Sequence, residues 1–156
     1  MSDYKGRFNL FFLNFNDDLP GWYRSSLEYF FDHGINVIDI DEQGFQSLLS
    51  QESNFHVLVI APNQKVARKM EKKLQSSSLG MAVRSKKVNL FYLSAVTTQF
   101  AFSLATKQKN FFFISMPLKI DMMVKRIRNI LDNSFSMDNR WPGGKRSGLL
   151  DLWEKK

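Results

Sequence analysis

The stretch 111–131, "FFFISMPLKIDMMVKRIRNIL", contains the two patterns that decide the fold. It begins with a run of strand-forming apolar residues, and after Met116 and Pro117 the apolar residues recur at helical spacing. The predicted buried stripe of this helix consists of Ile120, Met123, Ile127, Ile130 and Leu131, and the predicted solvent face carries Lys125, Arg126 and Arg128. The segment therefore predicts a buried strand followed by an amphipathic helix.

The same strand-then-helix order recurs along the chain upstream of this segment. Near-continuous apolar strands indicate parallel pairing with helices on both faces of one sheet, which is an α/β fold. The stretch 35–41 instead alternates at period two, as a half-buried or edge strand does. Strands are predicted at 8–15, 35–41, 55–61, 87–95 and 110–115, and helices at 23–34, 43–51, 63–75, 97–107 and 119–131.

The pattern stops after Asn133, and this position sets the predicted domain boundary. The stretch 133–148, "NSFSMDNRWPGGKRSG", is rich in Ser, Asn, Gly and charge, which is typical of a linker. A short apolar cluster, "LLDLW", follows it and is too small to fold alone. We therefore expect one domain over 1–132 and a basic linker with an apolar tail over 133–156.

Composition excludes several kinds of site. The 156 residues contain no cysteine, which excludes disulfides and thiolate chemistry, and only two histidines. The start, "MSDYKGRF", has no apolar segment typical of a secretory signal, and no apolar run approaches the length of a membrane span. We therefore expect a cytoplasmic protein without a membrane span.

The net charge of +7 is divided unevenly along the chain. Residues 1–60 contain three basic and nine acidic residues, whereas residues 61–156 contain nineteen basic and six acidic residues. This asymmetry indicates an anionic partner such as a nucleotide, a nucleic acid or an acidic protein surface. The other interpretation is that the lysines of helices such as 63–75 only keep a solvated face polar.

Functional sites of doubly wound sheets lie outside the carboxyl ends of the strands, so the residues at these ends are the candidates for a site. The first predicted strand is followed by Asp17 and Asp18, the third ends at Ala61, the fourth at Ser94 and the fifth at Met116. The two aspartates have an alternative role as helix N-caps, and Ser94 as a hydroxyl bonded to backbone.

These strand ends, together with Pro20, Arg24 and Gly34, resemble the receiver domain of bacterial response regulators (CheY-like). The resemblance covers about residues 8–132 and implies a flavodoxin-like, doubly wound (βα)5 fold with strand order 2-1-3-4-5. In that family the four strand ends carry an acidic pair, a phospho-accepting Asp, a Ser or Thr, and a Lys before proline. The sequence is therefore similar to a receiver of a two-component system.

Two departures from the family pattern predict that the phosphorylation chemistry is absent. Ala61 stands where the resemblance places the phospho-acceptor, and Met116 stands where it places the lysine. Phosphoryl transfer to a protein needs a nucleophilic carboxylate and a fixed cation, and neither residue supplies one. We expect Met116 to fill the emptied space, and no enzymatic activity, metal or cofactor. The degenerate phosphorylation pocket is predicted to consist of Asp17, Asp18, Ala61, Ser94 and Met116.

The resemblance also implies a surface for passing on a signal, over about residues 97–131. Phe100 and Phe102 cannot both be directed inward easily on one helical turn, so one of them is a candidate for exposure. An exposed aromatic residue within a basic rim is typical of an interface hot spot. The predicted protein-interaction face consists of Phe100, Phe113, Lys119, Met122 and Lys125.

The tail is a second candidate for binding. Arginine beside an aromatic residue suits phosphate binding and base stacking, and a short apolar segment suits docking on this domain or on a partner; disorder is the third alternative. The candidate residues are Arg140, Trp141, Lys145, Arg146, Leu150 and Trp153.

Two functions from different classes follow. The first is a phosphorylation-independent pseudo-receiver that binds a protein partner in a bacterial signalling or localisation system. The second is a binder of an anionic nucleotide, such as cyclic di-GMP, or of nucleic acid, through the basic half and the arginine-rich tail. The expected partner is a protein, with an anionic nucleotide as the alternative; nucleic acid belongs to the second hypothesis but is not the expected partner.

Overall fold

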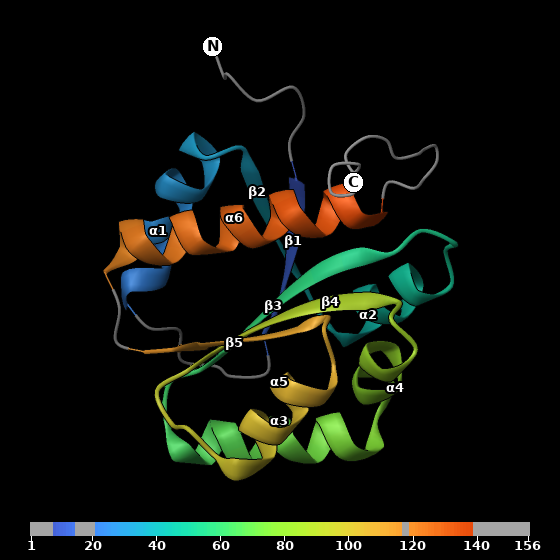
Figure 1. Cartoon of the computed structure of the whole chain (residues 1–156). Helices are drawn as coiled ribbons and strands as arrows, with labels where there is room; N and C mark the ends of the chain where they lie inside the picture. Colours follow the sequence, from blue (N-terminus) through green and yellow to red (C-terminus); the bar gives the residue numbers. More distant parts are fainter. Residues whose placement is uncertain (1–7, 15–20, 117–118, 139–156) are drawn as a thin grey trace.

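The sheet has five parallel strands in the order β2-β1-β3-β4-β5 (Figure 1). The computed structural model describes residues 8–14, 21–116 and 119–138. The predicted α/β class, the parallel pairing and the strand order are confirmed. The strands are β1 (Phe8–Leu13), β2 (Ile35–Ile40), β3 (Phe55–Ala61), β4 (Val88–Ser94) and β5 (Phe111–Ser115).

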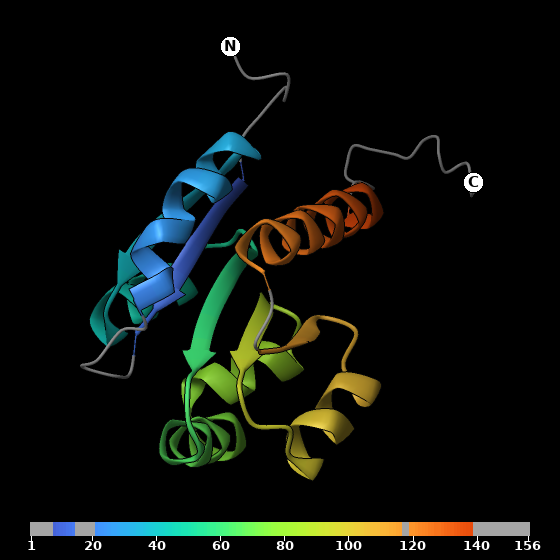
Figure 2. The same ribbon diagram turned by 90° about the vertical axis from the view of Figure 1, so that its left-hand side faces the viewer.

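Helices cover both faces of the sheet and divide the core in two (Figures 1 and 2). One core cluster lies under α2, α3, α4 and α5, and the other lies under α1 and α6. Side chains alternate along β4, so that Tyr92 enters the first cluster and Phe91 the second. The helices are α1 (Gly21–Asp32), α2 (Glu42–Leu49), α3 (Gln64–Ser76), α4 (Ser78–Arg84), α5 (Gln99–Lys107) and α6 (Ile120–Asp138).

Strand β2 is an edge strand, as its alternating sequence predicted, and its register is tied to the preceding helix. Helix α1 ends before Gly34, whose φ of 75° is the left-handed conformation that glycine adopts without strain. The Tyr23 hydroxyl donates a 2.8 Å hydrogen bond to Asp39 of β2. Burial, with this hydrogen bond, raises the pKa of Tyr23 above its ordinary range, so the pair is a neutral phenol on a carboxylate.

Helix α6 buries the predicted stripe but differs from prediction at Arg128. The Arg128 side chain is only 14% exposed and pairs with Asp132 at 2.9 Å. Its guanidinium lies 4.6 Å from the centre of the Phe8 ring and donates to the His33 carbonyl at 3.1 Å. The prediction that Arg128 lies on the solvent face is therefore wrong. The long Arg128 side chain extends to the amino end of β1. Its charge there contacts the Phe8 ring and the carbonyl groups that follow α1.

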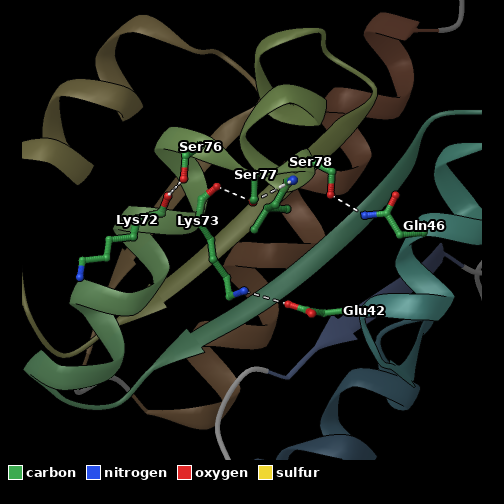
Figure 3. A network of polar contacts seen from close by, with 8 residues as sticks. Glu42, Gln46, Lys72, Lys73, Ser76, Ser77 and Ser78 are labelled. Carbon is green, nitrogen blue, oxygen red and sulfur yellow. Dashed lines mark hydrogen bonds and ion pairs between the residues drawn. The ribbon is translucent and has the colours of Figure 1, made fainter.

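The chain also departs from prediction between α3 and β4, where the structure adds α4. Three consecutive serines form the junction: Ser76 donates to the Lys72 carbonyl at 2.8 Å, and Ser77 to the Lys73 carbonyl at 2.5 Å. The Ser77 hydroxyl also accepts from the Leu79 N–H, which makes it the N-cap of α4 (Figure 3). Serine at an N-cap was the available signal, and the single glycine that follows obscured it.

Helix α6 continues to Asp138, five residues past Asn133, after which the sequence predicts a linker. Leu131 and Phe135 are four residues apart, so helical spacing does persist into the stretch expected to be linker. The remainder of the predicted linker and tail, 139–156, lies outside the described residues.

Glycine 80 is the close-approach point between α3 and α4. A Cβ atom built there would lie 2.0 Å from the Leu74 carbonyl oxygen, and backbone cannot give way as a side chain does.

We predict that Gly80→Ala lowers the free energy of unfolding by about 1–3 kcal/mol or more, measured by urea denaturation. Gly21→Ala is the matched control, because a Cβ at Gly21 meets no atom within 4 Å. Equal stability of the two variants would contradict this assignment.

A row of rings crosses the sheet on the α6 side and contains His56. The Phe8 ring contacts His56 at 6.0 Å between centroids, His56 contacts Phe91 at 6.4 Å, and Phe91 stacks on Phe112 at 5.1 Å. The His56 Nδ1 atom lies 3.2 Å from the Asn89 amide nitrogen. Burial lowers the pKa of His56 to about 4, so the ring is neutral at pH 7.

Because unfolding lets His56 take up a proton at its ordinary pKa of 6.5, acid favours the unfolded chain. We predict that this residue makes the free energy of unfolding fall as the pH drops from about 6.5 toward 4, by at most about 1.4 kcal/mol per pH unit. His56→Phe should remove this contribution. The measurement is the difference in the free energy of unfolding between wild type and variant as a function of pH. We expect this difference to be constant above pH 7.5 and to change below pH 6.5. A difference independent of pH down to pH 4.5 would show the prediction to be wrong.

Candidate functional site

The carboxyl edge of the sheet brings together three of the predicted pocket positions. Ala61 at the end of β3 is the register partner of Ser94 on β4, which in turn is the partner of Ser115 on β5. Backbone hydrogen bonds continue one step beyond: the Ala95 N–H donates to the Ala61 carbonyl at 3.0 Å, and the Met116 N–H to the Ser94 carbonyl at 2.8 Å. The three strand ends are therefore held side by side.

Ala61 ends the central strand with a fully buried methyl group. It offers no atom that can attack phosphorus. Asp17 and Asp18 lie outside the described residues, and within the described ranges no three histidine, aspartate or glutamate side chains gather as metal ligands would. At the end of β3, a buried methyl group thus stands where phosphoryl transfer needs a carboxylate.

Ser94 is fully buried, and its hydroxyl is committed to the turn that follows β4. It donates to the Val96 carbonyl at 2.8 Å and accepts from the Val96 N–H at 3.0 Å. Both hydrogen-bonding functions of the hydroxyl are used within two residues. This geometry corresponds to the alternative in which Ser94 is a strand-end hydroxyl bonded to backbone.

Met116 is partly buried and packs against the core under α1 and α6. Ala61 belongs to the opposite core, under α3 and α5. The expectation that Met116 fills the space at Ala61 therefore differs from the packing. The physical reason is the two-residue alternation of strands, which places Met116 on the same side as Ile114 of β5.

Two polar groups near this edge escaped the sequence analysis. The Tyr92 hydroxyl is buried in the α3/α5 core, near the Ser94 hydroxyl and the Glu71 carboxylate. Burial raises the pKa of Tyr92 to about 12; the Ser94 hydroxyl opposes this rise and the negative charge of Glu71 adds to it, so the phenol stays protonated. The Glu71 carboxylate itself accepts a hydrogen bond from the Thr98 hydroxyl, which caps α5. A tyrosine within an apolar strand was the signal for the first group.

The predicted interaction face lies around the edge strand β5, with α5 packed on one side of it and α6 starting on the other (Figure 2). Lys119, Met122 and Lys125 are exposed, Met122 to 53%. Phe100 and Phe113 are instead partly buried against the α3/α5 core.

Phe102 is the exposed member of its pair, at 63%, which confirms that Phe100 and Phe102 do not both point inward. Phe102 therefore replaces Phe100 in the candidate face. In α5, Ala101 is buried against the core and Phe102 lies on the solvent side. We define the β5-edge face as Phe102, Phe113, Lys119, Met122 and Lys125.

The predicted tail site lies outside the described residues: Arg140, Trp141, Lys145, Arg146, Leu150 and Trp153. Among the helices that the structure describes, none combines the length and the apolar character needed to span a membrane.

No protein-family model matches the chain, and no curated protein matches it.

Proposed function

We propose that this chain is a phosphorylation-independent protein-interaction module, a pseudo-receiver that acts as an adaptor in a bacterial signalling or localisation system. The observation that carries the proposal is Ala61. The parallel sheet with order 2-1-3-4-5 aligns the carboxyl ends of β3, β4 and β5, and the central one ends in a buried methyl group. A protein with this arrangement has no nucleophile at the position where the resembling family is phosphorylated.

The β5-edge face supports binding of a protein. Two large apolar side chains, Phe102 and Met122, are more than half exposed there. Exposed lysines occur on or next to the same elements: Lys107 and Lys109 precede β5 in the chain, and Lys119 and Lys125 follow it. An exposed aromatic residue with a charged rim fits a partner that offers an apolar pocket surrounded by acidic residues.

The chain's chemistry is tested by exposure to acetyl phosphate and Mg²⁺, followed by intact-mass spectrometry. We predict no phosphoryl adduct, because Ala61 has no nucleophilic atom and the Ser94 hydroxyl is engaged with Val96. A phosphorylatable receiver treated in the same reaction is the positive control. A stable adduct of one phosphoryl group on this chain would overturn the assignment of Ala61.

Partner binding is tested with Phe102→Ser combined with Met122→Ser. We predict at least a tenfold loss of affinity for the partner captured from the native cell, measured by calorimetry, with thermal unfolding unchanged because both side chains are exposed. Met81→Ser is the matched control, since Met81 is 65% exposed but lies on α4.

Two further variants separate the hypotheses. Deletion of 139–156 leaves every described element intact and shows whether the tail contributes to partner binding. Arg140→Ala with Arg146→Ala tests the nucleotide alternative: saturable binding of cyclic di-GMP that this pair of changes abolishes would favour that alternative. Partner affinity equal in the β5-edge variant and the Met81 control would refute the role of the β5-edge face.

A further inference from the structure

The charge asymmetry of the sequence is also an asymmetry in space. Residues 21–60, which form α1, β2, α2 and all of β3 except Ala61, contain one basic and six acidic residues. Residues 61–116, which form α3, β4, α4, α5 and β5, contain ten basic residues and one acidic residue, Glu71. Because β2 and β5 are the opposite edges of the sheet, one side of the molecule is acidic and the other strongly basic.

Helix α3 concentrates this positive charge along one line. Lys65, Arg68, Lys69 and Lys72 follow the spacing i, i+3, i+4, i+7 and are all exposed, while Val66, Ala67, Met70 and Leu74 of the same helix are buried. The line extends over about 10 Å at 1.5 Å per residue.

Its neighbour Lys73 does not belong to this line, because Lys73 turns to α2 and pairs with Glu42 at 2.9 Å. Figure 3 shows Lys72 directed away from that pair.

The line has a cost in helix stability, which the Asn63 N-cap of α3 offsets in part. Lys65 with Lys69, and Arg68 with Lys72, are like charges four residues apart, an arrangement that destabilises a helix. The first turn of α3 holds Lys65 and no acidic residue, although the positive end of the helix dipole favours an acidic one. A solvated face would be served equally well by alternating charges, so the excess of cations calls for a function.

A second, independent observation lies at the end of α4. Lys86 has a φ of 65° and is the one non-glycine residue with positive φ in the described part of the chain. Its N–H donates to the Val83 carbonyl at 3.1 Å, and the Lys87 N–H to the Ala82 carbonyl at 2.9 Å, which is the helix-ending turn that usually has glycine at this position. An exposed lysine is kept where glycine is unstrained.

Arg84 connects the two observations. Its guanidinium donates to the Leu74 carbonyl at 3.1 Å, so a cation of α4 is held at the last turn of α3. The close approach of Gly80 to Leu74 fixes this crossing. Arg84 and, two residues after it, Lys86 thus add two exposed cations next to the end of α3. We call Lys65, Arg68, Lys69, Lys72, Arg84 and Lys86 the basic track.

We propose that the basic track binds the phosphate backbone of a nucleic-acid duplex without reading its base sequence. A row of cations matches a row of phosphates, and a duplex carries one charge per about 1.7 Å of its axis. The exposed positions of α3 hold no apolar or aromatic side chain, so α3 offers neither the apolar centre of a protein interface nor a stacking surface for single-stranded bases. Four of the six residues of the basic track are lysines, whose compact point charge suits contact with phosphates.

The proposal is independent of the proposed function, since the basic track lies on α3 and α4 and the β5-edge face on α5, β5 and α6. The acidic side, around α1, β2 and α2, would be held away from the polyanion by repulsion. A duplex and a protein partner therefore have separate surfaces on one chain.

The test is fluorescence anisotropy of the full-length chain with two short duplex DNAs of unrelated sequence. We expect equal affinity for both, and a slope of log K against log salt of about −4, corresponding to four or five phosphate contacts. Lys65→Gln with Arg68→Gln and Lys72→Gln should weaken binding at least tenfold and make the slope shallower by about three. The matched control, Lys5→Gln with Arg24→Gln and Arg126→Gln, removes the same charge at positions that belong neither to the basic track nor to the β5-edge face, and should bind within twofold of wild type.

Lys86→Gly separates a binding role from a structural one. It should raise the denaturant midpoint, because glycine relieves the left-handed strain, and yet weaken duplex binding and make the salt slope shallower by about one. A variant that is more stable and binds as well as wild type would remove Lys86 from the basic track.

Other anions serve as competing outcomes in the same assay. Vesicles containing phosphatidylserine test a membrane surface, where Met81→Ser should matter because Met81 is exposed three residues before Arg84. Polyglutamate tests an acidic protein. The proposal is overturned by absence of duplex binding, by equal loss in the track variant and the charge-matched control, or by binding of vesicles or polyglutamate in preference to duplex.

Discussion

The structure depends on burial of β3 and β4 between two layers of helices. Both strands are buried along almost their whole length, so each residue's side is fixed by alternation and a one-residue slip would exchange the two cores. That constraint sets Ala61 beside Ser94 and aligns the end of β5 with them. The register also fixes which residue occupies the pocket, because no other residue can take the place of Ala61 at the end of β3.

The sequence predicted the sheet because its signals are strong where both faces of a strand are buried. Apolar runs such as 55–61 specify parallel strands, and Gly34 marks the end of α1. The prediction was wrong where tertiary contacts override local pattern. Arg128 looks like a surface residue in sequence, but Phe8, which is 120 residues earlier, receives it. Helix α4 depends on capping by Ser77 and on the close approach of Gly80 to Leu74.

The candidate site was predictable in part. The strand-end residues Ala61 and Ser94 follow from the strand pattern, and the structure brings them together. The direction of the Met116 side chain follows from the two-residue alternation of β5, if that alternation is continued one residue past the end of the strand. Exposure of Phe102 rather than Phe100 depends on how α5 is rotated against the sheet, and sequence spacing alone left both assignments open. Glu71 and Tyr92, from α3 and β4, become neighbours only in the folded chain.

We infer that the carboxyl edge of the sheet does not respond to phosphoryl groups. The most direct test of this inference is the amide spectrum of the isotopically labelled chain, recorded by NMR with and without beryllium fluoride and Mg²⁺, which mimic a phosphorylated carboxylate. The account predicts no change at Ala61, Ser94 or Met116, nor along β5. Saturable shifts that begin at these residues and extend into α5 would contradict it, because they would show a working acceptor at this edge.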